Sequence, residues 1–545
     1  MPFDPDAERP NILWISFEDT SPRYGCYGDE LARTPTIDRL AAEGCRYPNT
    51  FAVAGVCAPA RHAVITGMYP TFTGAHHMRT THQTTATPEL PTPYDCVPPH
   101  YVRCFSEHLR AAGYFCTNNR KTDYQFEPPL SAWDELSTEA HWRHRPDPDQ
   151  PFFAVFNKEH THESGMWDVR WDGRELQTDP AKVAVPPYLP DTPRVREAIA
   201  RQYDNIAADD EWAAGLIAQL EADGLLENTI IFHWSDHGEG LPRHKRWPYD
   251  TGVRVPMVVR WPESLPRPFE PGAVDERLVS TIDLGPTVLS LAGVDVPRHM
   301  QGKPFVGPAA EPRDRVYATR DRYDTAYDMV RAVRDDRFKY LRNYYPHTPR
   351  AVWLPYRDRQ PTSREMWRLE AEGKLQGPQR VMFEPRPAEE LYDTRADPHE
   401  IDNLAGDPAH AETLARMRAK LDELLDAYDR FGDMDEAAMK RQWWAGETQP
   451  TTAMPRAFAY NADEFGQEPV AGGQLLQAPV LVKLHCPTQG GSIVWTLDPA
   501  DEPAHWNLSV EPIRFTEPGD YVLQARAHRI GFKPSPTLRL NLRIV

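Results

Sequence analysis

The sequence has no long hydrophobic run. None of the apolar stretches in this chain of 545 residues approaches the ~20 residues that a membrane-spanning helix needs. The N-terminal segment MPFDPDAERP lacks the apolar core that secretory signals carry. These absences predict a cytoplasmic protein without a membrane partner.

Positive charge is scarce. The chain has 61 Lys and Arg residues against 80 Asp and Glu residues, which gives a net charge of −19. An excess of negative charge repels phosphate backbones, so the composition argues against a nucleic-acid partner. It does not exclude a small anionic substrate, because such a molecule responds to a local cluster of cations.

Cysteine and glycine are also few. Seven Cys in a chain of this size exclude a disulfide scaffold, and their odd number predicts a reducing compartment with mostly buried thiols. Proline is frequent instead, with 55 Pro against 31 Gly, so many segments should be loops with restricted backbone angles. The length predicts two or three domains.

Three apolar runs have the form of strands that are buried on both faces, as in a parallel sheet. They are residues 11–17, 152–156 and 229–234. Ionisable side chains follow each run: Glu18 and Asp19 the first, His160 and His162 the second, Asp236 and His237 the third. Because open α/β sheets bind ligands at the carboxyl ends of their strands, we expect these side chains to build one site.

The pattern of predicted elements divides the chain into three parts. Amphipathic segments at 35–43, 104–112 and 195–223 alternate with the apolar runs, which predicts an α/β domain with a mostly parallel sheet over 1–325. A hairpin (329–333 and 338–341) and a helix (409–428) predict a smaller antiparallel subdomain over 326–448. A polar linker at 446–460 and a small β-sandwich-like tail are expected in the third part, 449–545.

The most informative motif is CAPAR at residues 57–61, which TGMYP at 66–70 follows. It resembles the signature of the formylglycine-dependent (type I) sulfatases of the alkaline phosphatase superfamily. The resemblance implies the α/β fold of that superfamily. It also implies that a formylglycine-generating enzyme oxidises Cys57 to an aldehyde, whose hydrate is the nucleophile.

Further matches follow in the order that the family has, over roughly residues 10–430. They are PNIL (10–13) with ED (18–19), TPTIDRLA (34–41), GY (113–114), SDHGE (235–239), GVRVP (252–256) and ELYD (390–393). Only the tail has no counterpart in this resemblance.

The resemblance implies one divalent cation. Its ligands would be Glu18, Asp19, Asp236, His237 and the modified Cys57. Carboxylate oxygens are hard ligands that suit Ca²⁺, and a cation would offset the charge on the peripheral oxygens of a sulfate ester. An imidazole at the position of His237, where many relatives have Asn, makes the site softer, so Mn²⁺ and Zn²⁺ are alternatives to Ca²⁺.

Three basic side chains have positions that match the family motifs. Arg61 is expected to orient the hydrate, because its guanidinium can bond two oxygens at once. Lys121, eight residues after Gly113, and Lys245, four residues before Tyr249, are expected to contact the sulfate oxygens.

Histidines are the candidate proton donors. His162 matches a family histidine near the leaving-group oxygen, and a side chain with an ordinary pKa near 6.5 can donate a proton there. His160 is a second candidate on the same loop, and His244, next to Lys245, is a third residue that could face the substrate.

One departure from the family pattern concerns the base that releases sulfate. The family commonly has His two residues after the first lysine, whereas this chain has Asp123. Asp123 is one candidate, and His76 or His77 from another loop are the others. The sequence does not choose among the three.

The sequence therefore predicts a metal-dependent sulfuric-ester hydrolase. One alternative keeps the fold and nucleophile but cleaves phosphonate monoesters or phosphodiesters. Another is a non-catalytic binder of sulfated glycans with an unmodified Cys57. The leaving group (aryl, sugar, choline or sulfamate) and the oligomeric state, monomer or homo-oligomer, stay open. Aromatic and basic residues in 141–174 and 343–370 are candidates for lining a pocket.

Overall fold

The computed structural model describes residues 9–82, 88–461 and 465–545. Its centre is an eight-stranded sheet in the order β10-β2-β9-β7-β1-β6-β4-β5. The strands are β1 (Asn11–Phe17), β2 (Gly44–Arg46), β4 (Phe115–Asn119), β5 (Glu135–Leu136), β6 (Phe152–Lys158), β7 (Thr229–Trp234), β9 (Met257–Arg260) and β10 (Ala273–Val274). Within this sheet only β9 runs antiparallel to its neighbours. The predicted α/β architecture with a mostly parallel sheet is confirmed.

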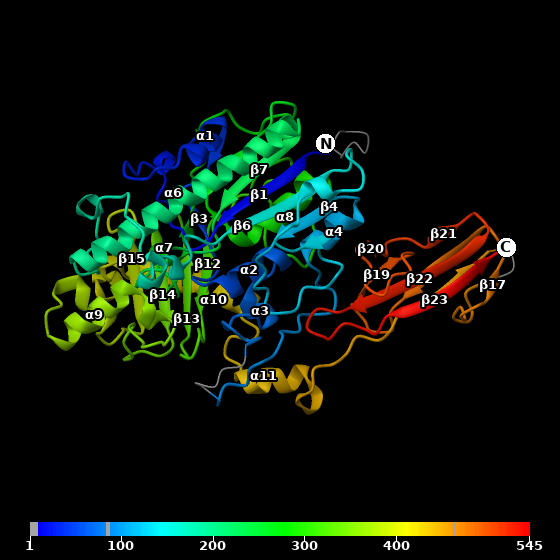
Figure 1. The fold of residues 1–545 in the computed structure, drawn as a ribbon. Helices are drawn as coiled ribbons and strands as arrows, with labels where there is room; N and C mark the ends of the chain where they lie inside the picture. The colour runs from blue at the N-terminus through cyan, green and yellow to red at the C-terminus, as the bar shows by residue number, and fades with distance from the viewer. Residues whose placement is uncertain (1–8, 83–87, 462–464) are drawn as a thin grey trace.

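Helices cover both faces of this sheet (Figure 1). Ile12 and Trp14 of β1 pack in a cluster with α2 (Cys57–Thr66), α4 (Phe105–Ala111) and α8 (Leu284–Leu291). Leu13 and Ile15, which alternate with them, pack on the opposite face against α1 (Pro35–Glu43) and α6 (Pro193–Ala222). Burial on both faces explains why β1 is apolar throughout, rather than alternating.

The three strands that precede ionisable side chains are neighbours. β1 lies between β7 and β6 and runs parallel to both, with Ser16 opposite Trp234 and Phe17 opposite Lys158. The loops that follow the three strands therefore leave the sheet at the same edge. This register brings Glu18, Asp19 and Asp236 together.

A second, antiparallel sheet contains β12 (Val316–Arg320), β13 (Val330–Arg334), β14 (Phe338–Asn343) and β15 (Glu389–Asp393) in that order. It includes the predicted hairpin. Helix α10 (Ala411–Tyr428) buries Leu414, Met417, Leu421 and Leu424 in a cluster with residues of this sheet and of the loop before α2. The sheet thus supports the segment that carries Cys57.

The tail forms two further sheets with a shared apolar cluster between them (Figure 1). One contains β16 (Arg456–Tyr460), β18 (Val480–His485) and β21 (Ile513–Phe515). The other contains β17 (Leu475–Leu476), β19 (Ser492–Thr496), β20 (Asn507–Leu508), β22 (Gly519–His528) and β23 (Leu538–Ile544). The expectation of a linker up to residue 460 is wrong, because Ala457 and Ala459 of β16 are buried in the sandwich.

The remaining α-helices are α3 (Pro70–Thr73), α5 (Asp168–Trp171), α7 (Asp250–Val253), α9 (Pro361–Ala371) and α11 (Glu436–Trp443). A small three-stranded sheet has the order β11 (Val279–Ser280), β3 (Thr50–Phe51), β8 (Arg254–Val255). Across the described ranges, no helix has the length and apolar character required to cross a membrane. All seven Cys are free, and all except Cys26 and Cys486 are buried, as the sequence predicted.

Candidate active site

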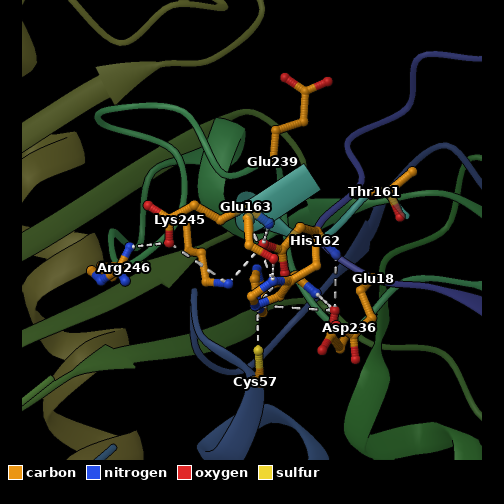
Figure 2. Close-up of polar contacts among 12 residues, drawn as sticks. Glu18, Cys57, Thr161, His162, Glu163, Asp236, Glu239, Lys245 and Arg246 are labelled. Carbon is orange, nitrogen blue, oxygen red and sulfur yellow. Dashed lines mark hydrogen bonds and ion pairs between the residues drawn. The ribbon is translucent and has the colours of Figure 1, made fainter. Parts of the chain in front are cut away.

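Cys57 is the first residue of α2, and its side chain is buried. It lines a cavity of about 450 Å³, called here the Cys57 pocket, together with Lys121, His162, Lys245 and Tyr356. Figure 2 shows the Cys57 sulfur directed at a group of imidazole and carboxylate side chains, whereas Glu239 points away from that group. The pocket therefore joins the start of α2 to the loops after the central strands.

His237 is the nearest polar contact of Cys57. The Cys57 Sγ lies 3.2 Å from His237 Nε2. The other ring nitrogen, Nδ1, donates a hydrogen bond to the Gly238 carbonyl oxygen at 2.9 Å. Burial lowers the pKa of His237, so the ring is neutral and Nε2 carries a lone pair. An imidazole oriented in this way is a suitable metal ligand.

Three buried carboxylates lie in this part of the site: Glu18, Asp19 and Asp236, of which Asp19 and Asp236 are neighbours of the His237 ring. Burial raises the pKa of Glu18 to about 7, although Lys121 and Arg61 oppose the shift. Burial acts in the same direction on Asp19, but Lys245 and other cationic neighbours outweigh it and lower the pKa of Asp19. The pKa of Asp236 is lowered in the same way, with Arg61 as the largest opposing charge.

Three cations pair with these carboxylates. Arg61 lies one helical turn after Cys57 on α2, and its Nε donates to Asp236 Oδ2 at 2.9 Å. The Lys121 Nζ is 2.7 Å from Glu18 Oε1, and the Lys245 Nζ is 2.7 Å from Asp19 Oδ2. The formal charges of these six side chains cancel. Such pairing is expected because a buried charge without an opposite partner strongly destabilises the folded state.

Two features of the donor set fit a divalent cation. The lone pair of His237 Nε2 faces Asp19 Oδ1 at 3.2 Å, so two electron-pair donors lie opposite each other with no proton between them. Among the described residues, Asp19 Oδ1 and Glu18 Oε2 are buried and have no hydrogen-bond partner. Asp19, Cys57, Asp236 and His237 each offer one ligand atom, and these atoms lie within 4.8 Å of one another.

His162 lines the Cys57 pocket from the loop after β6. Its Nδ1 accepts hydrogen bonds from the Ser164 hydroxyl at 2.9 Å and from the Ser164 backbone N–H at 3.3 Å. Burial and the nearby Lys245 lower the pKa of His162 well below its usual range. The ring is therefore neutral with its proton on Nε2, so His162 can donate a hydrogen bond but does not carry the second proton that a general acid gives up.

The other two candidate histidines lie outside this pocket. His160 is exposed, its Nδ1 lies 2.8 Å from Asp209 Oδ1, and it lines a neighbouring cavity. His244 is buried, accepts a hydrogen bond from the Tyr188 hydroxyl at 2.7 Å and faces Glu239. It is not among the residues that line the pocket, so the structure does not bring it to the substrate side of Lys245.

Of the three candidate bases, only Asp123 lines the Cys57 pocket. Its Oδ2 lies 3.2 Å from the Lys121 Nζ. His76 and His77 instead pack against each other in the interior, with ring centroids 4.1 Å apart and ring planes tilted by 45°. His77 Nδ1 accepts the backbone N–H of Arg322, which holds that ring against the antiparallel subdomain.

Sequence reasoning missed several side chains of this site. The Glu163 backbone N–H donates to Asp19 Oδ2 at 2.7 Å, and the Glu163 carboxylate accepts from Arg246 at 2.9 Å. Asn157, at the end of β6, accepts from Arg61 at 2.9 Å. Their positions at strand ends and beside motif residues were usable signals. For Tyr356, the only signal in the sequence was its place in the aromatic segment 343–370.

The family model described as "Sulfatase" matches residues 10–126 and 115–294. An ulvan-active sulfatase from Formosa agariphila is 40% identical over 573 aligned positions, which cover 98% of this chain and 91% of that protein. The chain belongs to the sulfatase family. It is a sulfuric-ester hydrolase of the alkaline phosphatase superfamily, as the CAPAR motif indicated.

Other comparisons extend this assignment of the sulfatase. A second family model, "N-sulphoglucosamine sulphohydrolase, C-terminal", matches residues 238–375. The human N-sulphoglucosamine sulphohydrolase is 26% identical and aligns with 75% of this chain and 89% of its own length.

Two solved structures show the same fold. One is in complex with its substrate D-glucosamine-2-N,6-O-disulfate (TM-score 0.55, 19% identity, 78% of this chain and 100% of that chain). The other is the phosphonate monoester hydrolase of Agrobacterium radiobacter (TM-score 0.56, 18% identity, 77% of this chain and 96% of that chain).

Proposed function

We propose that this sulfatase uses a formylglycine generated from Cys57 and one divalent cation bound beside it. The observation that carries the proposal is the lone pair of His237 Nε2, which faces both the Cys57 Sγ and Asp19 Oδ1. Glu18, Asp19, Asp236 and His237 would hold the cation. Bound there, it would supply positive charge to the sulfate oxygens and acidify the hydrated aldehyde.

The charge balance of the pocket supports this assignment. Three carboxylates and three cations cancel, and Asp123 adds one further carboxylate beside Lys121, so a dication still leaves an excess of positive charge that suits an anionic sulfuryl group. In the sulfatase, Lys121 and Lys245 are proposed to turn from their carboxylate partners toward the sulfate oxygens. Arg61 is proposed to hold the Cys57 side chain in position, because both residues lie on one face of α2.

The donor set favours Ca²⁺, because three of its four side chains offer hard carboxylate oxygens. His237 makes Mn²⁺ and Zn²⁺ alternatives. Metal analysis of the purified protein, followed by chelation and reconstitution with each ion, tests this assignment. Activity restored equally well by Mg²⁺ alone would contradict it.

Two side chains are proposed to act on the leaving group and on the release of sulfate. His162, neutral with its proton on Nε2, donates a hydrogen bond from that N–H to the leaving-group oxygen and stabilises the negative charge that develops there. Burial alone would raise the pKa of Asp123, but Lys121 and Arg61 outweigh burial and lower it, so Asp123 is a carboxylate. It is therefore available as the base that releases sulfate.

A sulfate ester of a sugar is the proposed substrate. Support comes from the relative described as ulvan-active and from the solved neighbour that binds a sulfated glucosamine. Phosphonate monoester hydrolysis is a second candidate activity, because a phosphonate monoester hydrolase has the same fold. Relative turnover of an aryl sulfate and an aryl phosphonate monoester separates the two, and a preference for the sulfate is expected. The paired, buried charges around Cys57 disfavour a non-catalytic glycan binder.

A further inference from the structure

A second cavity, of about 640 Å³, adjoins the Cys57 pocket, and His162 lines both. Segments after β4 and β6, together with the region of α5, form its walls. Four basic side chains line this second cavity: Arg120, Lys158, Arg170 and Arg174. Glu159 is the single carboxylate among its lining residues. We call it the basic cavity.

None of these four cations forms an ion pair with a residue in the described parts of the chain. The guanidinium of Arg174 lies 4.3 Å from the centre of the Trp171 ring, and the Lys158 Nζ lies 5.2 Å from the Trp212 ring. Aromatic contacts hold these two side chains in place, and neither has a carboxylate at ion-pair distance among the described residues, although Lys158 also acts electrostatically on the buried Asp209. Arg201, which also lies near Trp171, is by contrast paired with Asp168 at 2.9 Å.

The cluster is unexpected for the composition of the chain. The chain has 80 acidic and 61 basic residues, so carboxylates outnumber the cations that could pair with them. Four cations that form no ion pair with any described residue therefore create a local positive potential around one cavity, in a protein of net charge −19. Such a potential attracts anions to this place and not to the rest of the surface.

We propose that the basic cavity binds a second anionic group of the substrate, a carboxylate or sulfate on the sugar next to the one that reacts. This inference rests on the proposed function. With the reacting sulfate at Lys121 and Lys245, the leaving group lies at His162, which is the boundary between the two cavities. The rest of an oligosaccharide would then extend into the basic cavity.

The chemistry of its walls fits this ligand. Arginine offers parallel N–H donors that match the oxygens of a carboxylate or sulfate. Asn119, Asn157, Ser164 and Asn205, which also line the cavity, supply neutral polar groups for sugar hydroxyls. Its volume lies within the ~300–1,000 Å³ usual for ligand pockets. The substrate class is thus an acidic oligosaccharide with at least two anionic groups.

Binding to the inactive Cys57→Ala chain tests the proposal without consuming the ligand. The probes are ulvan-derived disaccharides with one sulfate and one uronate, the same disaccharides with the carboxyl group reduced to an alcohol, and a disulfated disaccharide. Arg170→Ala/Arg174→Ala is the test variant. Arg456→Ala/Arg514→Ala is the matched control, because it removes the same charge from exposed positions on β16 and β21 of the tail.

We expect the test variant to bind at least one of the two doubly anionic probes about tenfold more weakly than the Cys57→Ala chain does, since each exposed ion pair contributes up to about fivefold. The control pair should bind normally, and the reduced probe should not respond to either variant. If the test variant binds both doubly anionic probes as tightly as its parent, or if the parent binds neither, the proposal is wrong.

A separate assay distinguishes this failure from failure of the proposed function. An aryl sulfate has no second anion, so its turnover by the Cys57-containing test variant should match that of the wild-type sulfatase. If aryl sulfate turnover and disaccharide binding fall equally, the two arginines attract any anion to the protein, and the proposed subsite for a second anionic group is wrong. Absence of aryl sulfate turnover in the mature wild type would instead contradict the proposed nucleophile, whatever result the disaccharide binding measurements give.

Discussion

The Cys57 pocket and the basic cavity lie side by side, yet they differ in whether their cations are paired with carboxylates. In and beside the pocket, Arg61, Lys121 and Lys245 are each paired with a buried carboxylate. In the basic cavity, the cations have no ion-pair partner within the described parts of the chain, and the arginines among them are exposed. Paired, buried charges hold one another in position before substrate arrives, as chemistry requires. Unpaired, exposed charges gain a partner only when an anion binds, as recognition requires.

Replacement of Cys57 should have the largest effect. Cys57→Ala removes the atom from which the nucleophile is made, so nearly all turnover should be lost on every substrate. The thermal melting temperature and circular dichroism spectrum should be unchanged, because the substitution removes one buried atom. Steady-state assays on an aryl sulfate check this result. A variant that keeps more than a few per cent of wild-type activity would exclude Cys57 as the nucleophile.

Loss of the cation should come next. Asp236→Asn keeps the shape of the side chain but removes one ligand charge and the partner of Arg61. We expect this variant to lose activity and to fail to regain it when the chelated protein receives metal. Calorimetric titration of the apo-protein with Ca²⁺ gives a readout independent of turnover. Normal metal affinity in Asp236→Asn would remove Asp236 from the ligand set.

The two lysines should rank third. Lys121→Ala and Lys245→Ala each remove a cation that stabilises the transferring sulfuryl group in a water-poor site. Each should lower kcat/KM by roughly two to three orders of magnitude, whatever the leaving group. Lys182→Ala, at an exposed position outside both cavities, is the matched control and should have no effect. A loss that depends on the leaving group would contradict a role at the sulfate oxygens.

His162, at the boundary between the two regions, should show a smaller and selective effect. A hydrogen-bond donor to the departing oxygen matters most for poor leaving groups such as sugar alkoxides, and little for a nitrophenolate. His162→Ala should therefore spare activated aryl sulfates relative to alkyl sulfates, as a comparison of kcat/KM on the two shows. An equal loss on both would make His162 a sulfate-binding residue.

Salt should produce the smallest difference. The Debye length falls from about 10 Å at 0.1 M to about 3 Å at 1 M ionic strength, which screens exposed charges more than buried ones. Added salt should raise the KM for a doubly anionic disaccharide more than the KM for an aryl sulfate. Equal slopes of log KM against log salt concentration would remove the contrast between the two regions.

The sequence predicted which strand ends meet, because the acidic side chains directly follow apolar strands. Parallel strands end at one edge, so Glu18 after β1 and Asp236 after β7 had to meet once their apolar runs were recognised. The motif around Cys57 supplied the rest. The choice of base was different: nothing local indicates that His76 and His77 turn inward, and only the packing of their loop against Arg322 decides it.

The basic cavity and the tail were harder to predict for other reasons. Arg170 and Arg174 belong to a polar segment without hydrophobic periodicity, so nothing in the sequence separated them from ordinary solvated cations. Tyr356 reaches the Cys57 pocket from a distant part of the chain. Strand β16 was missed because its buried residues, Ala457 and Ala459, are only weakly hydrophobic.

The state of residue 57 in active protein tests the central claim most directly. Protein produced together with a formylglycine-generating enzyme should be digested, and the peptide that contains Cys57 analysed by mass spectrometry beside an aryl sulfate assay of the same sample. The account predicts a sulfur-free aldehyde at residue 57, in a fraction that rises in proportion to specific activity across preparations. Full activity in a preparation whose Cys57 is entirely an unmodified thiol would contradict it.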